Sequence, residues 1–127
     1  MPLVRIDALR MDRERLDVLG DAVQQALMET IGIPADDRFQ ILTNHDGGAS
    51  TLRHGTYFDI PRDDGLVYID ITLRAGRTDD QKKALYARLC HLAGERARVE
   101  PRNVFVVLRE NAPSDWSLGD GVAQYLG

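Results

Sequence analysis

The sequence of 127 residues contains a single cysteine, Cys90, so an internal disulfide bond is excluded. One unpaired thiol fits a reducing compartment, and we expect a cytoplasmic protein. No apolar run approaches the roughly 18 residues that span a bilayer. No basic segment leads into an apolar one as in a secretory signal. The sequence therefore predicts a protein that does not enter a membrane.

A basic excess is also missing, since the net charge is −4 and the isoelectric point is near 5.3. This charge argues against binding to nucleic acid or to a membrane surface. His45, His54 and His91 lack the spacing of metal ligands and are expected on the surface. Phosphate-binding loops, nucleophile elbows and nucleotide fingerprints are absent from the sequence. We therefore expect neither a metal nor a cofactor.

What the sequence does contain is typical of one globular domain over residues 1–127, with 43% hydrophobic and 28% charged residues. Apolar spacing predicts two helices, and Cys90 falls on the buried face of the second. Between residues 44 and 64 no period is sustained, which predicts a long loop with a short hairpin near Tyr57. The expected strands are 1–6, 37–42, 66–73 and 104–108, and the expected helices are 13–30 and 79–98.

The two halves of the chain, about 2–43 and 66–110, repeat one another and are followed by a tail over 111–127. Pro34 and Pro101 stand 67 residues apart, and the same shift places Ile41 on Leu108. Each half consists of a strand, a capped helix, a proline and a strand, which forms a right-handed β-α-β unit. The predicted fold is α/β (α+β in some schemes), a four-stranded mixed sheet with two helices on one face. The other face would be left bare, which favours an oligomer.

Pro2 leads directly into the first strand. If Met1 is removed, Pro2 becomes a secondary amine at the chain terminus, and the sheet would hold it rigidly. Burial would lower the pKa of this amine towards neutrality. The dipeptide Met-Pro alone favours an incidental second residue, so the role of Pro2 depends on the rest of the chain.

A duplicated β-α-β unit headed by Met-Pro resembles the tautomerase superfamily, whose members use an amino-terminal proline. Within it, the chain is most similar to the malonate semialdehyde decarboxylase family. The stretches that carry this resemblance are residues 1–3, 33–40, 74–82 and 110–119. The resemblance covers nearly the whole chain and implies a homotrimer that acts on a small oxo acid without a cofactor.

The same resemblance implies a set of site residues. Asp37 and Arg77 match a carboxylate and an arginine that work with Pro2. The family has a second arginine where this chain has Ala75, and Arg74 lies one place further back. On a regular strand Arg74 would point to the opposite face, unless a bulge at residues 75–76 redirects it. The candidate catalytic residues are Pro2, Asp37, Arg74 and Arg77, and the candidate substrate-binding residues are Trp116, Leu118 and Tyr125.

Two reactions, and one role without catalysis, are compatible with these residues. Decarboxylation of a 3-oxo acid such as malonate semialdehyde, with a hydratase side activity, needs a cationic Pro2 as electron acceptor. Enol–keto tautomerisation of phenylpyruvate-like acids needs Pro2 as a neutral base. Asp37 close to the amine would favour the cation. A non-catalytic oligomeric module of the same fold is the third possibility.

Overall fold

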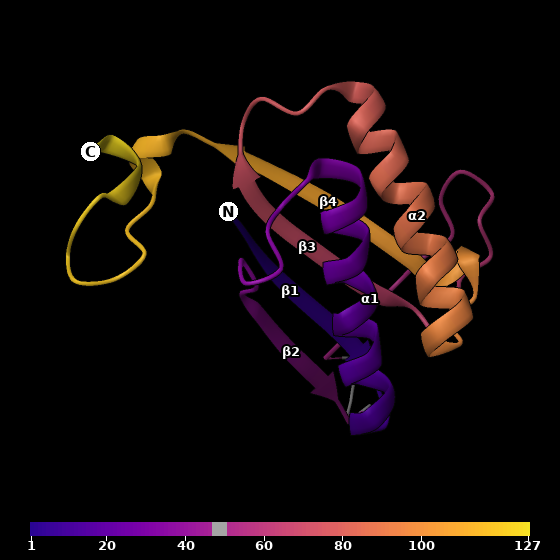
Figure 1. Cartoon of the computed structure of the whole chain (residues 1–127). Coiled ribbons are helices and arrows are strands. Elements are labelled where there is room, and N and C mark those ends of the chain that lie inside the picture. The colour runs from indigo at the N-terminus through magenta and orange to yellow at the C-terminus, as the bar shows by residue number, and fades with distance from the viewer. Residues whose placement is uncertain (47–50) are drawn as a thin grey trace.

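The computed structural model describes residues 1–46 and 51–127. Four strands in this part of the chain form one sheet in the order β2-β1-β3-β4. β1 and β3 are antiparallel neighbours, and each has a parallel partner on its outer side. Both helices lie on the same face of the sheet (Figure 1). The strands are β1 (Pro2–Leu9), β2 (Gln40–His45), β3 (Val67–Arg74) and β4 (Val104–Asn111), and the helices are α1 (Arg13–Ile31) and α2 (Asp79–Ala97).

Both helices begin and end where local signals predict. Asp12 caps α1, and Thr78 and Gln81 form a reciprocal capping box at the start of α2. Gly32 ends α1 in the left-handed conformation, with φ 71°, which glycine adopts without steric cost. The predicted fold class is confirmed, and the helix bounds agree within one residue.

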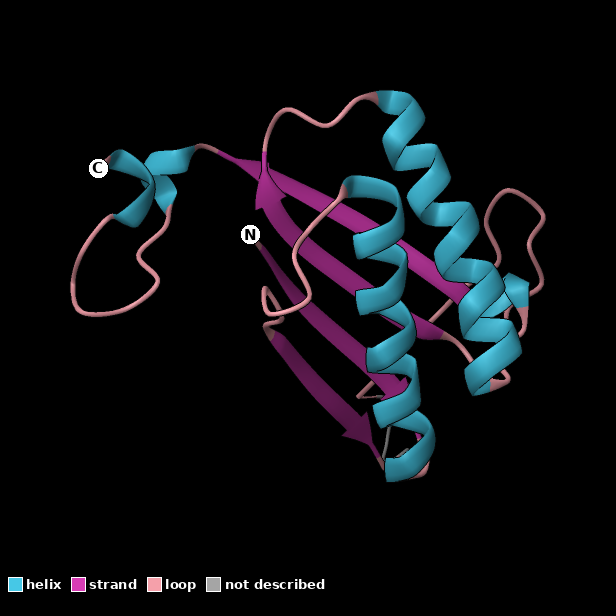
Figure 2. Ribbon diagram, viewed as in Figure 1, coloured by secondary structure: helices cyan, strands magenta, loops and turns pink. Residues whose placement is uncertain are grey.

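The core lies between the sheet and the helices. Val4 and Ile6 of β1 and Ile71 of β3 are almost fully buried and face leucines of α1 and α2. In the described part of the chain no helix covers the opposite face of the sheet (Figure 2), and the segment before β3 reaches only one end of it, where Arg62 lies 5.8 Å from the centre of the Phe105 ring. On this face Ile41, Phe105 and Val107 keep 39%, 41% and 40% of their surface exposed. Such exposed apolar side chains on a sheet are typical of a surface that another chain covers.

The second strand begins later than predicted, at Gln40 rather than Asp37. Residues 34–37 form a turn in which the Asp37 amide donates to the Pro34 carbonyl at 3.1 Å. The repeat also slips by one residue here. Leu42 and Leu108 of β4 both pack against the core, whereas Ile41 lies on the other face of the sheet. Side chains alternate along a strand, so the counterpart of Leu108 is Leu42 rather than Ile41.

Three further expectations can be compared with the structure. The hairpin predicted near Tyr57 is a small turn closed by a bridge between Tyr57 and Ile60, and residues 47–50 of the expected loop lie outside the described residues. His54 and His91 are on the surface, but His45 is half-buried and its ring contacts Asp7. Cys90 is only half-buried rather than part of the core, although burial raises the pKa of its thiol.

Candidate active site

The amino terminus of the chain is held inside the protein. Pro2 lies opposite Leu73 of β3, and both residues are buried. Met1 keeps only 8% of its surface exposed. Ordinary termini are solvated, so this one is unusually enclosed.

Asp37 forms an ion pair with this terminus. One carboxylate oxygen, Oδ2, lies 3.3 Å from the Met1 amine. The other oxygen, Oδ1, is buried without a hydrogen-bond partner. Because the turn over residues 34–37 keeps Asp37 out of the β2 ladder, its side chain is available to the terminus.

Gln24 of α1 holds the turn that carries Asp37, a role that was not predicted from the sequence. Its buried side chain donates to the backbone carbonyl of Asp37 at 3.3 Å and lies 3.5 Å from that of Pro34. The amide thus holds the backbone of the turn without using the carboxylate, which faces the chain terminus. A glutamine on the core face of a predicted helix is the one signal that could have indicated this role, since buried amides need partners.

Arg74 is the last residue of β3 and lies opposite Asn111 of β4. The strand stays regular, with the Ala75 amide bound to the Asn111 carbonyl at 2.8 Å, so no bulge redirects Arg74. Its side chain therefore starts from the open face of the sheet, one residue beyond the partner of Pro2. Its Nε is buried without a hydrogen-bond partner. Its guanidinium carbon lies 4.0 Å from the centre of the Tyr125 ring.

Arg77 is turned towards its own loop instead. Its guanidinium donates to the Arg74 carbonyl at 3.1 Å. Glu110 holds the same loop: Lys82 forms an ion pair with it, and the Gly76 amide and Arg77 also lower the pKa of its carboxyl. Gly76 has a φ of 128°, which lets the chain turn between the two arginines. The structure therefore links Arg77 to the shape of the loop rather than to the terminus.

The tail after β4 brings two of its three predicted residues to this end of the sheet. The Trp116 indole donates to the Asn111 side chain at 2.7 Å, and Asn111 lies opposite Arg74. Tyr125 contacts Arg74 directly. Leu118 remains 43% exposed on the outer part of the tail. The tail projects from the same end of the sheet as the amino terminus, as Figure 1 shows.

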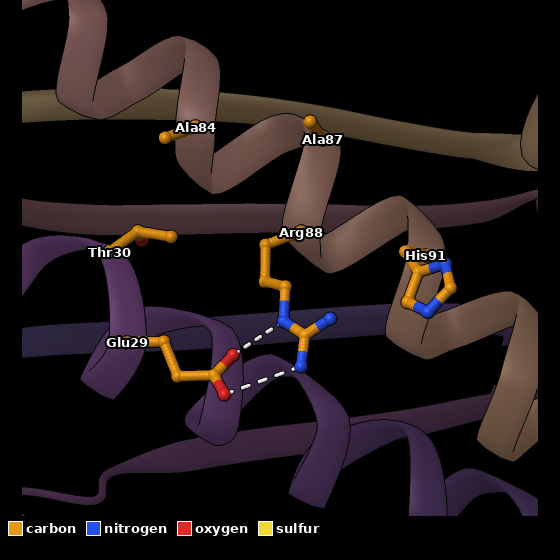
Figure 3. A pocket seen from close by; sticks show the side chains of 6 residues that line it. All are labelled: Glu29, Thr30, Ala84, Ala87, Arg88 and His91. Atoms are coloured by element: carbon orange, nitrogen blue, oxygen red, sulfur yellow. Dashed lines mark hydrogen bonds and ion pairs between the residues drawn. The ribbon is translucent and has the colours of Figure 1, made fainter.

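A hollow lies on the outer side of the helix layer, away from the amino terminus. This open groove of about 680 Å³ runs between α1 and α2, and Figure 3 shows its lining. Across it Arg88 binds both carboxylate oxygens of Glu29, which lowers the pKa of Glu29 below its usual value. The charges of Glu29 and Arg88 therefore neutralise each other. In the described residues, the buried side-chain nitrogen and oxygen atoms without a hydrogen-bond partner belong to Asp37 and Arg74. The end of the sheet that holds the amino terminus is therefore the better site.

Comparison with known proteins agrees with this geometry. A family model described as "Tautomerase enzyme" matches residues 37–119, and a second model with the same description matches residues 2–59. The probable tautomerase YusQ of Bacillus subtilis (strain 168) is 35% identical over 128 residues, which is 99% of either chain. The chain belongs to the tautomerase family. Its members are enzymes of the isomerase and lyase classes.

Solved structures place this tautomerase close to the malonate semialdehyde decarboxylases. The FG41 malonate semialdehyde decarboxylase, inhibited by 3-bromopropiolate, is 38% identical with a TM-score of 0.89, covering 98% of this chain and 94% of that one. A second one, described in wild-type, proline-to-alanine mutant and inactivated forms, is 29% identical with a TM-score of 0.88 and shares of 98% and 95%. A fused 4-OT solved as an asymmetric trimer is 26% identical, with a TM-score of 0.76 and shares of 98% and 98%.

No helix in the described part of the chain is both long and apolar enough to cross a membrane.

Proposed function

We propose that this tautomerase is a cofactor-independent decarboxylase of a small 3-oxo acid such as malonate semialdehyde, acting through the amine of Pro2. The observation that carries the proposal is the ion pair between the chain terminus, here the Met1 amine, and the half-buried Asp37. Charge pairing with a neighbouring carboxylate stabilises the cationic form of an amine. A decarboxylase needs the Pro2 amine as a cation, whereas a general base needs it neutral.

Removal of Met1 would create both the catalytic group and its pocket. The terminal charge would move to the Pro2 nitrogen, one residue further into the sheet. Because Met1 is buried, its removal would vacate space next to the Pro2 nitrogen, where a small acid would bind. Substrate would then lie between the amine, the carboxylate and the open face of the sheet.

The reaction would proceed by transfer of one electron pair. Arg74 would bind the carboxylate of the 3-oxo acid, and the Pro2 cation would donate a proton or hydrogen bond to the aldehyde oxygen. The bond between the carboxyl carbon and the neighbouring methylene would break, carbon dioxide would leave, and the electron pair would form an enol. Carbon would then take a proton from water while the enol oxygen returns its proton to Pro2, which would give acetaldehyde and restore the Pro2 cation.

Hydration of an unsaturated oxo acid is a natural side activity of the same site. The unpartnered Oδ1 of Asp37 is a buried hydrogen-bond acceptor and would hold a water molecule beside the substrate. One of the solved relatives is described with both decarboxylase and hydratase activities.

Enol–keto tautomerisation of phenylpyruvate-like acids is the second candidate. One feature favours it: Arg77 is bound to its own loop, which leaves one arginine rather than two for the substrate. The curated relative from Bacillus subtilis also carries the name of a probable tautomerase. This reaction would require Pro2 to be neutral and to act as a base near pH 7.

A homotrimer is part of the proposal, because the bare face of the sheet exposes Ile41, Phe105 and Val107. The trimeric fused 4-OT has the same fold. Two copies packed on this face would complete a pocket that starts at Arg74 and the amino terminus. The unpaired Cys90 is consistent with the expected cytoplasmic location.

Three measurements test the function in sequence. A mass spectrum of the purified protein should show that Met1 is absent, since a retained Met1 would block the Pro2 amine. 3-Bromopropiolate should then inactivate the protein and label Pro2, as shown by peptide mapping. Turnover of malonate semialdehyde should fall at least about 100-fold in Pro2→Ala; equal turnover by this variant would contradict the proposal.

The protonation state of Pro2 separates the two reactions. A titration of the ¹⁵N-labelled proline followed by NMR should give a pKa near or above 9 for a decarboxylase. A value near 7, together with faster turnover of phenylpyruvate than of malonate semialdehyde, would favour the tautomerase. Absence of both activities in a correctly processed trimer would identify a non-catalytic module.

A further inference from the structure

We propose that the ring of Tyr125 positions the guanidinium of Arg74 for an anionic substrate, so that the carboxyl-terminal tail takes part in anion binding through Arg74. The inference rests on the proposed function for its substrate class. It concerns the face of an aromatic ring rather than the phenol group. Tyr125 is thus a positioning residue, whereas the sequence predicted only that it lines the pocket.

The first argument is the surroundings of Arg74. Among the residues that the structure describes, no carboxylate forms an ion pair with it, and its Nε is buried without a partner. The contact that holds the guanidinium is the Tyr125 ring, at 4.0 Å from its central carbon. An aromatic face attracts a cation without neutralising it. The N–H groups at the edge of the guanidinium therefore remain available to a ligand.

The second argument is the contrast with the other arginines near strand ends. Arg109 of β4 is bound to Asp70, and Arg77 donates to a backbone carbonyl. A carboxylate partner would compete with an anionic substrate, because both would use the same donors. Only an aromatic partner fixes the position of Arg74 and leaves its charge uncompensated.

The third argument is that the tail holds Tyr125 in a defined place. The neighbouring Gln124 accepts a hydrogen bond from the Leu118 amide at 2.8 Å and donates to the Gly119 carbonyl at 2.9 Å. These two bonds tie the arms of the tail loop together. Trp116 connects the same loop to Asn111, opposite Arg74. The segment that carries the Tyr125 ring is therefore held by hydrogen bonds and is not a free chain end.

The test uses malonate as an inert dicarboxylate probe, whose dissociation constant is measured by titration calorimetry on the full-length protein. We expect Tyr125→Leu to weaken malonate binding about five- to tenfold, which corresponds to the loss of one partly buried cation–π contact. Tyr125→Phe and Tyr125→Trp should bind within about twofold of the parent, because both keep an aromatic face. Tyr57→Leu, which alters an aromatic residue 74% exposed elsewhere, is the matched control and should not change binding.

A double-mutant cycle separates positioning from simple lining of the pocket. If Tyr125 acts through Arg74, Tyr125→Leu should have no further effect on malonate binding once Arg74→Ala is present. An equal loss in both backgrounds would overturn the inference, and so would a loss in Tyr125→Phe as large as that in Tyr125→Leu. Failure of the parent to bind malonate would also overturn it, because Arg74 would then not be an anion site.

Malonate binding does not depend on turnover, so this result is independent of the Pro2→Ala experiment. If the parent binds malonate and the cycle shows coupling while malonate semialdehyde is not consumed, the proposed reaction is wrong and the role of Tyr125 stands. Where turnover is observed, KM should rise in Tyr125→Leu more than kcat falls, since the carboxylate is bound in the ground state as well.

Discussion

One carboxylate oxygen of Asp37 pairs with the chain terminus, and the other is buried without a hydrogen-bond partner. Burial of an unsatisfied acceptor lowers the stability of the folded protein, typically by about 1–3 kcal/mol. Its backbone, in contrast, is fully bound, by the Pro34 carbonyl on one side and Gln24 on the other. A rigid backbone with one unpartnered carboxylate oxygen is the arrangement expected of a group that binds a substrate or a water molecule.

The first prediction follows from this arrangement. Asp37→Asn should lower kcat for malonate semialdehyde about 100-fold or more, because the amine loses its charged partner. The thermal midpoint of Asp37→Asn should also fall, because the variant loses the charge that pairs with the chain terminus. Asp36→Asn, which alters the exposed neighbour, is the control and should keep the activity of the parent. Equal losses in both variants, measured by steady-state kinetics, would contradict a special role for Asp37.

The two arginines lead to a second prediction. Arg74→Ala should raise KM for the acid substrate at least about tenfold, because a charge-assisted contact is worth roughly 1.5–3 kcal/mol. Arg77→Ala should act mainly on the loop that it binds, with a lower thermal midpoint and a KM within about threefold of the parent. Kinetics and thermal melts of both variants give the comparison. A larger increase in KM for Arg77→Ala than for Arg74→Ala would identify Arg77 as the anion-binding residue.

At the scale of elements, the loop from β3 to α2 depends on Glu110 of β4. Lys82 and the Gly76 amide both bind its carboxylate, and its pKa is lowered below the usual 4.5. A carboxyl whose pKa is lower in the folded state contributes stability above its unfolded pKa, and this contribution is lost as the pH falls through the folded pKa.

The third prediction is the pH dependence of this anchor. Glu110→Gln should melt at a lower temperature than the parent at pH 7, and the difference should shrink as the pH drops below about 4.5. Thermal melts of both proteins between pH 3 and pH 8 measure it. A difference that stays constant with pH would show that the charge of Glu110 is not what holds the loop.

Local signals made most of the elements predictable from sequence. Capping by Asp12 and Thr78, and the glycine after α1, fixed the helix ends within one residue. The start of β2 could not be found in this way, because Asp37 and Arg38 fit a strand and a turn equally well by pattern. The turn exists because Gln24, distant in sequence, binds its carbonyls.

The site was predictable only in part, for the same reason. The resemblance to a family pointed to Pro2, Asp37 and the arginines, but a pattern of residue types does not give side-chain directions. The turn of Arg77 towards the Arg74 carbonyl and the contact of Arg74 with Tyr125 result from packing of the loop and the tail. The sequence contains no local signal for either contact.

For the whole molecule, the bare face of the sheet is the dominant feature. It carries exposed apolar residues beside charged ones such as Arg109 and Asp70, which bind each other. Exposure of the apolar side chains of this face to water is unfavourable in free energy. The face is suited to contacts with other copies of the chain.

The fourth prediction tests that assembly. The parent should form a trimer in size-exclusion chromatography with light scattering, and Val107→Glu, on the open face, should dissociate it because burial of an unpaired charge is unfavourable. Tyr86→Glu is the control: it has nearly the same exposure, 39% against 40%, but lies on α2, so the trimer should persist. Dissociation of the control variant alone would place the interface on the helices.

The antiparallel pairing of β1 with β3 sets Val4 of the first repeat opposite Ile71, its own counterpart in the second. A local twofold axis therefore passes between them, and the fold has two equivalent strand starts. Only one of them is a chain end. At the other, the nitrogen of Ile69 stands where Pro2 stands, but it is an amide without basicity inside a continuous strand. If Pro2 is the reactive amine, the joining of the repeats in one polypeptide would leave one such amine for two repeats, and each chain would take up one equivalent of an amine-directed inhibitor.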